Sequence, residues 1–333
     1  MSIRYRPMRS KDVAGAVALV ASHPVAGPRY GDSIHQLASA WLRLLSQRAF
    51  WPIVFEELRA DRAQMLGAAA SVFVNDDFLR ELKTPPFFWI GSELTHRIAR
   101  GKSPLLSDRE VAAANTFGGL NLVLWHMSID PEEAKRDDVR MQVSGAFIEC
   151  HRGYLLKEMI ALQATFPEEA QWIADSGSLL LNPEDGNYET FLTQETENII
   201  SVPHVFGLTR ELAFMRMSWT TSLFLYEPPK VTFSPSEQRL LVAALRGATD
   251  EELSDELAIS LSAVKKAWCS VYDRAVAHLP DSILNHDGRE ETRNGDRGRQ
   301  KKQRLLAYLR EHPEELRPFS RKTQKECQVQ QSN

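Results

Sequence analysis

Residues 1–229 alternate between segments with the apolar spacing of strands and segments with that of helices. Strand-like segments are expected at residues 3–8, 51–56, 65–74, 120–129, 177–181 and 219–226. Apolar residues three and four positions apart predict helices at residues 10–22, 33–47, 147–164 and 204–215. This order of elements predicts an α/β or α+β domain with a mixed sheet.

A purely helical pattern with clear start signals follows from residue 233 onward. Ser234 with Glu237, and Thr249 with Glu252, each have the spacing of a capping box, in which two side chains satisfy backbone N–H groups at a helix start. Ser260 is a natural N-cap for a third helix. The sequence therefore predicts three short helices, with a tight turn at residues 258–260 between the second and the third.

The third of these helices, from Leu261 to about Ala275, presents different side chains on its two sides. Its apolar residues are expected to face the core of the unit: Val264, Trp268, Val271 and Tyr272. Small and basic residues are left on or beside the outer face: Ser262, Ala263, Lys265, Lys266 and Cys269. Because the DNA major groove admits a helix of this kind, we predict an all-α helix-turn-helix domain that binds double-stranded DNA.

The stretch from Phe233 to Arg274 resembles the LuxR-type helix-turn-helix family. The family's approximate pattern is L-T-x-R-E-x-E-V-L, then G-x-[ST]-[ND]-x-E-I-A-x-x-L-x-I-S, then x-x-T-V-K. The residues that match in type are Phe233, Ser234, Glu237, Leu240, Leu241, Gly247, Thr249, Asp250, Glu252, Leu253, Leu257, Ile259, Ser260, Val264, Lys265, Val271 and Tyr272. The residues that depart from the pattern are Ser236, Ala263 and Ala267.

The resemblance implies that the third helix is the recognition helix. Lys265 and Lys266 are then expected to reach guanine edges or phosphates in the groove. Thr249, Ser262 and Lys265 are expected phosphate contacts, and Ala263 and Cys269 lie on the same side of the helix.

The charge of this stretch leaves other interpretations open. From Thr232 to Pro280 the chain carries five basic and seven acidic residues, whereas a DNA-binding module usually has a basic stripe. The acids gather on the second helix and the lysines on the third. A module that packs on a partner protein is the alternative, and a sigma-factor region, which uses a similar motif, ranks lower because no companion promoter-binding region is visible upstream.

The end of the chain divides into a linker and a basic helix. Residues 281–298 lack apolar periodicity and are rich in Asp, Asn, Gly and Arg, which predicts a flexible linker. Residues 299–333 predict a basic amphipathic helix and tail, with apolar Leu305, Leu306, Tyr308 and Leu309. This basic segment could contact phosphates, dock on the first domain or mediate self-association.

Length and composition limit the remaining possibilities. The 333 residues suggest two domains with extensions, and the net charge of −4 argues against a nonspecific polycation. No run of 18 apolar residues and no signal-peptide core are present, so a cytosolic protein is expected. The three cysteines are far apart and the histidines lack paired-ligand spacing, so no disulfide framework, metal site or cofactor is predicted.

Three segments of the first domain are similar to parts of the GNAT acetyltransferase fold. IRYRPMRSKDVAGAVALV resembles its first strand and helix, VFEELRADRAQMLGAAASVFV its central meander with Gly67 in a strand, and HRGYLLKEMIA the start of its cofactor helix. We therefore expect a GNAT-like mixed sheet in residues 1–229, with an unrelated α/β domain as the alternative.

The family's acetyl-CoA loop, [QR]-x-x-G-x-[GA], is incomplete in this chain. Near Gly153, Cys150 replaces the first polar residue and Leu155 the last glycine. Near Gly145, Phe147 occupies that last position. A bulky side chain there blocks the close backbone approach that a pyrophosphate needs. Tyr226 and Glu149 are only general candidates for acid or base, so no catalytic residue is assigned.

These observations together predict a cytosolic, bacterial-type transcription regulator. Residues 230–280 are expected to bind DNA as part of a homodimer, and residues 1–229 to set the oligomeric state or to sense a small molecule. The alternative is an acyl-CoA-dependent N-acetyltransferase with a helical appendage. A third possibility is a protein-interaction scaffold.

Overall fold

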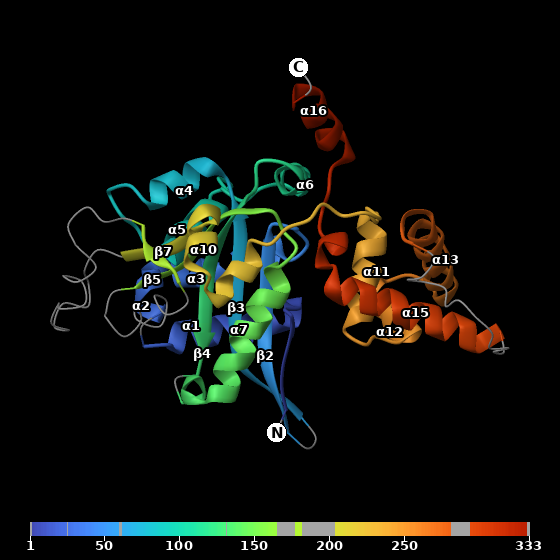
Figure 1. Cartoon of the computed structure of the whole chain (residues 1–333). Helices are drawn as coiled ribbons and strands as arrows, with labels where there is room; N and C mark the ends of the chain where they lie inside the picture. The colour runs from blue at the N-terminus through green and yellow to red at the C-terminus, as the bar shows by residue number, and fades with distance from the viewer. Residues whose placement is uncertain are drawn as a thin grey trace. The chain divides into compact units, whose positions relative to one another are not determined.

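The computed structural model describes residues 2–24, 26–59, 62–130, 132–164, 177–181, 204–280 and 294–331. The chain divides into two compact units (Figure 1). The first comprises Met1–His151 and Leu155–Phe224, and the second comprises Arg152–Tyr154 and Leu225–Asn333.

A seven-stranded sheet forms the centre of the first unit, in the order β1-β2-β3-β4-β5-β7-β6. The sheet is mixed because β4 and β5 are parallel, whereas the other neighbouring pairs are antiparallel. The strands are β1 (Ser2–Pro7), β2 (Phe50–Arg59), β3 (Arg62–Val74), β4 (Leu120–Ile129), β5 (Leu156–Ala164), β6 (Leu179–Leu180) and β7 (His204–Thr209). This arrangement confirms the predicted mixed α/β sheet domain.

Helices cover both faces of this sheet. The larger core lies between one face and the helices α1 (Val13–Ser22), α2 (Ala26–Tyr30), α3 (Ile34–Leu44), α4 (Asp76–Leu82) and α5 (Ile90–Ala99). The helix α7 (Asp137–His151) packs on the other face (Figure 1). There, apolar side chains of β2 and β3 meet Val139, Val143 and Ala146. A further helix, α6 (Asp108–Thr116), precedes β4 and begins with a capping box at Ser107.

Three segments of the first unit differ from the sequence-based expectation. The helix predicted at residues 147–164 ends at His151, and β5 follows from Leu156. The helix predicted at residues 204–215 is β7 followed by α10 (Arg210–Arg216). The strand predicted at residues 219–226 is the short 3-10 helix η4 (Trp219–Leu223) and an extended segment.

The physical reason for these differences is pairing across the sheet. Leu156 pairs with Leu120 in register, and β7 pairs with both β5 and β6. Apolar spacing in a short segment does not separate a buried strand from a helix, so such partners decide the outcome.

The described residues of the second unit form helices and connecting segments. They are α11 (Pro235–Leu245), α12 (Asp250–Leu257), α13 (Leu261–His278), α15 (Asn294–Glu311), the 3-10 helix η5 (Pro313–Leu316) and α16 (Arg321–Gln331). The apolar face predicted for the basic helix is buried in the unit's core with α11 and α13: Leu305, Leu306, Tyr308 and Leu309. The basic helix is therefore a structural member of this unit.

The predicted linker and helix differ in part from the structure. Helix α15 begins at Asn294, within the predicted linker, and ends at Glu311, after which η5 and α16 follow. Residues 281–293 of the linker lie outside the described residues. His312 and Pro313 follow α15, and Pro313 begins η5, where a proline without an N–H is well tolerated.

A buried carboxylate, Glu315, fixes the chain that enters α11. Its oxygens accept hydrogen bonds from the backbone N–H groups of Lys230 and Val231, each at 2.9 Å, and from the Tyr308 hydroxyl at 3.0 Å. Burial and the nearby Glu315 charge raise the pKa of Tyr308, so the phenol keeps its proton and acts as the donor.

Replacing Glu315 with glutamine is expected to lower the free energy of unfolding of the second unit by about 1–3 kcal/mol. One of the two carboxylate oxygens becomes an NH₂ group, which cannot accept a hydrogen bond, so one of the backbone N–H groups of Lys230 and Val231 loses its acceptor. Urea denaturation of the full chain measures this loss. Glu311→Gln, which makes the same change at an exposed position, should shift the midpoint little. Equal effects of the two substitutions would contradict the anchoring role of Glu315.

Candidate functional site

The second and third helices of the C-terminal unit are joined by a three-residue turn. Ala258 ends α12 in the left-handed conformation, with φ of 53°, and Ser260 caps α13 by accepting a hydrogen bond from the Ala263 N–H. The turn is fixed from both sides, because the Ile259 N–H donates to the Ser254 carbonyl and the Ser254 hydroxyl donates to the Ile259 carbonyl. The connection between α12 and α13 is therefore short and is held by hydrogen bonds from both of its ends.

A small core holds α13 against its neighbours. Leu253 of α12 and Val264, Trp268 and Val271 of α13 are buried together. The ammonium group of Lys302 on α15 lies 4.5 Å from the Trp268 ring centroid and 3.0 Å from an Asp250 carboxylate oxygen. These contacts determine which side of α13 remains exposed.

The predicted DNA-contacting residues have the following positions. Thr249 is the N-cap of α12, where its side chain accepts a hydrogen bond from the Glu252 N–H. Ser262, Lys265, Lys266 and Cys269 are exposed on α13, and Ala263 is half-buried. The structure thus brings five of the six residues onto one helix and places the sixth at the start of the preceding helix.

Internal ion pairs neutralise several acids of this unit. Asp250 pairs with Lys302, Glu256 with Arg246, and the buried Glu237 with Arg274 at 2.9 Å. Glu252 is used in the capping box, where it accepts from the Thr249 N–H. Two of these pairs use bases of the same stretch, Thr232 to Pro280, and only Lys302 comes from outside it, so the pairs reduce the excess of acids by one.

Glu237 joins the start of α11 to α13. Burial disfavours its charged form, but hydrogen bonds from the Ser234 N–H and the Ser270 hydroxyl, together with the Arg274 charge, hold the pKa of Glu237 below its usual range. The carboxylate therefore stays ionised at neutral pH and ties Arg274 to α11. Within the part of the second unit that the structure describes, Lys265 and Lys266 take part in no ion pair.

The residues weighed for acetyl-CoA chemistry belong to different elements and units. Gly145 lies within α7, and Gly153 lies in the second unit at a positive φ of 82°. A Cβ at Gly153 would meet the Glu314 N atom at 2.6 Å, so its glycine is required by packing. Residues 156–161, compared above with the start of a cofactor helix, form the strand β5, which corrects that comparison.

The two general acid or base candidates belong to different units. Glu149 is exposed on α7 of the first unit, and Tyr226 is part of the second. Burial, with a contribution from the Glu314 charge, raises the pKa of Tyr226 to about 12. The connection from β4 to α7 is acidic, with Asp130, Glu132 and Glu133 before the helix and Asp137 and Asp138 in its first turn. Four of these carboxylates, Glu132, Glu133, Asp137 and Asp138, form ion pairs with Lys135, Arg136 or Arg140.

Sequence reasoning missed the role of Lys302 in positioning α13. Its contacts join α15 to α12 and α13 across a long stretch of sequence, and only the Lys301-Lys302 pair beside an apolar helix face hinted at it. It also missed a buried hydrogen bond between Ser71 and His151, because the two residues are 80 positions apart and no local pattern joins them.

Comparisons with known proteins identify no family for this chain. No family model matches the sequence, and no curated protein matches it. Among solved structures, the chain is similar to the spermidine/spermine N-acetyltransferase SpeG from Vibrio cholerae, solved in mutant forms, with a TM-score of 0.33 and 12% sequence identity. The match covers 62% of this chain and 92% of that one. A likeness at this level assigns neither fold family nor activity.

No helix in the described part of the chain combines the length and apolar character needed to cross a bilayer. Among those residues, no group of three or more His, Cys, Asp or Glu side chains could hold a metal ion.

Proposed function

We propose that the chain is a sequence-specific DNA-binding transcription regulator and that α13 is its recognition helix. The observation that carries the proposal is the exposed side of α13, which presents Ser262, Lys265, Lys266 and Cys269 directly after a three-residue turn from α12. The B-DNA major groove is wide enough to admit one helix, and the first residues of such a helix contact base edges.

Each exposed group of α13 has a contact that suits its chemistry. Lys265 and Lys266 can donate hydrogen bonds to guanine O6 and N7 or neutralise phosphates. The hydroxyls of Ser262 and Thr249 can donate to phosphate oxygens at the starts of α13 and α12. Ala263 and Cys269 are small enough to let the helix approach the floor of the groove.

The distribution of charge supports the same assignment. Asp250 and Glu256 of α12 have basic partners within the unit, whereas both lysines of α13 are exposed without such partners among the described residues. The two lysines lie towards the start of α13, and the exposed acid of this helix, Asp273, lies towards its end. The LuxR-type assignment is the finer part of the proposal and is supported by the caps at Ser234, Thr249 and Ser260.

The same proposal includes a homodimer and a role for the first unit. Two-fold pairing would place half-sites about 10–10.5 base pairs apart, or at multiples of that distance. We propose that the first unit, whose GNAT-like character rests on the β1–α1 opening and the β2–β3 meander, sets the oligomeric state or senses a small molecule. In the β3 strand, the backbone of the neighbouring strand β4 passes close to Gly67. A Cβ at this position would meet the Ser128 carbonyl oxygen at 2.7 Å.

The test of DNA binding is a fluorescence anisotropy titration of short duplexes with the full-length protein at two salt concentrations. Binding should weaken steeply as the salt concentration rises. The logarithm of the association constant K should fall with the logarithm of the salt concentration, with a slope of about −0.9 for each phosphate neutralised. Binding that is absent at low salt, or that does not depend on salt, would contradict the proposal and favour a protein-interaction module.

A further inference from the structure

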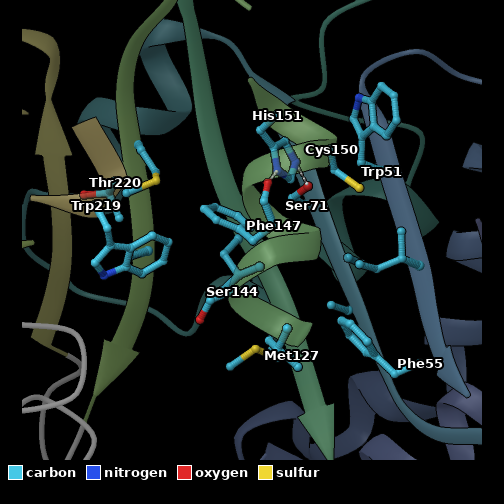
Figure 2. Close-up of a pocket in the computed structure, with 17 residues that line it drawn as sticks. Trp51, Phe55, Ser71, Met127, Ser144, Phe147, Cys150, His151, Trp219 and Thr220 are labelled. Carbon is cyan, nitrogen blue, oxygen red and sulfur yellow. Dashed lines mark hydrogen bonds between the residues drawn. The ribbon is translucent and has the colours of Figure 1, made fainter. Parts of the chain in front are cut away.

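An apolar cavity lies between α7 and the sheet of the first unit (Figure 2). Its lining comes from β2, β3, β4, β5, α7 and η4, so all the main elements on this side of the sheet contribute. Aromatic side chains form much of the wall: Trp51, Phe55, Phe147 and Trp219. No Asp, Glu, Lys or Arg is among its lining residues.

The cavity is larger than a single buried water requires. Its volume is about 70 Å³, whereas a single buried water needs about 10–15 Å³ and two to four polar partners. The polar side chains on the wall are few: Ser71, Ser144, His151 and Thr220. Several waters would therefore lack hydrogen-bond partners, and an apolar ligand is the better occupant.

Trp219 lies where the cavity lining meets the solvent. This side chain lines the cavity from η4 and is also 45% exposed, which is high for a tryptophan in a core. In Figure 2 Trp219 lies on the side of Phe147 away from Trp51 and the Ser71–His151 pair. A ligand that enters beside Trp219 would therefore meet the polar pair at the far side of the cavity.

The polar pair in the cavity wall has defined hydrogen-bond directions. The His151 Nδ1 lies 2.8 Å from the Phe147 carbonyl oxygen, which can only accept, so Nδ1 carries the proton. The neutral ring then offers a lone pair at Nε2, and the Ser71 hydroxyl donates to it over 2.6 Å. The Ser71 Oγ keeps lone pairs that can accept a hydrogen bond from a group inside the cavity.

We propose that this cavity is a binding site for an uncharged aromatic molecule with one O–H or N–H donor. The ring packs against Phe147 and the neighbouring apolar lining residues, and its donor hydrogen-bonds to Ser71 Oγ. Aromatic walls favour a ring through offset and edge-to-face contacts. The absence of charged lining side chains excludes an ionised ligand, because a charge without a partner is costly to bury. The inference concerns the first unit and does not depend on DNA binding by the second.

Isothermal titration calorimetry of the full-length protein with phenol and with anisole tests the proposal. Phenol should bind saturably at one site. Anisole has the same ring without the donor, so it should bind roughly three- to tenfold more weakly, the factor expected for one hydrogen bond. Equal affinities for the two compounds would contradict the role of Ser71, and no saturable binding of phenol would overturn the site itself.

Substitutions that fill the cavity locate the binding. Ala69 lines the cavity from β3, on the same side of the strand as Ser71, and Ala69→Met should abolish phenol binding. Ala161→Leu on β5 is a second filling variant, in case the first disturbs the fold. Ala18→Met adds the same side chain at an exposed position of α1 and should bind phenol like the parent protein. Unchanged phenol affinity in a folded filling variant would place the ligand elsewhere and refute the proposal.

Discussion

Replacement of both Lys265 and Lys266 by alanine is expected to weaken specific DNA binding by about 1–3 kcal/mol for each base contact that is lost, or roughly 5- to 150-fold per contact. Both side chains are exposed on α13 and are not needed for its packing, because its buried face is formed by Val264, Trp268 and Val271. The loss should therefore occur without a change in the stability of the unit. Anisotropy titrations with a selected duplex measure it.

The matched control for this double substitution is Lys11→Ala with Lys102→Ala. These two lysines are exposed in the first unit, so the control removes the same charge from the chain. The control variant should bind the duplex with nearly the affinity of the parent protein.

A single substitution can show which α13 lysine contacts a phosphate. Such a substitution should reduce the slope of log K against log salt by about 1. A double variant on α13 that binds DNA like the parent would show that the recognition helix has been assigned wrongly.

Acid is expected to destabilise the first unit through a buried histidine, His126. Burial, with a smaller contribution from the charge of His23, lowers the pKa of His126 from 6.5 to about 3. Its Nδ1 lies 3.2 Å from the Tyr30 hydroxyl, and among the described residues its Nε2 has no hydrogen-bond partner. The ring is surrounded by Tyr30 and Trp41 and is neutral in the folded state at neutral pH.

The sign of the effect follows from the order of the two pKa values. Above pH 6.5 the ring is neutral in both the folded and the unfolded state, so His126 gives no pH dependence. Between that pH and about 3 only the unfolded state binds the proton, so the free energy of unfolding falls by about 1.4 kcal/mol for each pH unit of acidification. From pH 6.5 to about 4.5 the loss is roughly 3 kcal/mol.

Urea titrations of the parent and of His126→Asn across this pH range measure the contribution. The variant cannot take up the proton, so its stability should depend less on pH, although its stability at neutral pH is lower. His35→Asn makes the same change at an exposed position of α3 and should keep the parental pH dependence. Identical pH profiles for the parent and His126→Asn would contradict the burial of a neutral imidazole.

Local signals in the sequence explain which elements could be predicted. The starts of α11, α12 and α13 carry N-caps at Ser234, Thr249 and Ser260, and the side-chain hydrogen bonds that these residues form were predicted from residue type alone. Capping depends on a few neighbouring residues and needs no knowledge of the rest of the fold. The strands β2, β3 and β4 were likewise evident from their apolar runs.

Elements that depend on distant partners could not be predicted. Leu156, Met159 and Ile160 have the spacing of a helix face, but parallel pairing with β4 makes this segment a strand. Within residues 204–215 the sequence does carry a helix-start signal, since Thr209 is the N-cap of α10. This cap marks the end of β7 and the start of the helix. The residues Trp219–Leu223 have strand-like composition, yet they form a 3-10 helix at the cavity beside α7.

The two candidate sites also differ in whether neighbouring residues in the sequence are enough to predict them. The exposed lysines of α13 follow from helical periodicity, since Val264, Trp268 and Val271 determine which side faces inward. The cavity of the first unit needs residues from β3, α7 and η4 together, and the adjacent Cys150 and His151 gave no indication that His151 meets Ser71. Spatial sites made from separate elements therefore required the structure.

The most direct test of the regulator assignment is a selection of bound fragments from a random duplex pool with the full-length protein at two salt concentrations. The account predicts an enriched, near-palindromic site whose half-sites are separated by about one helical turn, with recovery that falls as salt rises. Recovery of fragments without any shared sequence, at either salt concentration, would contradict sequence-specific binding by α13.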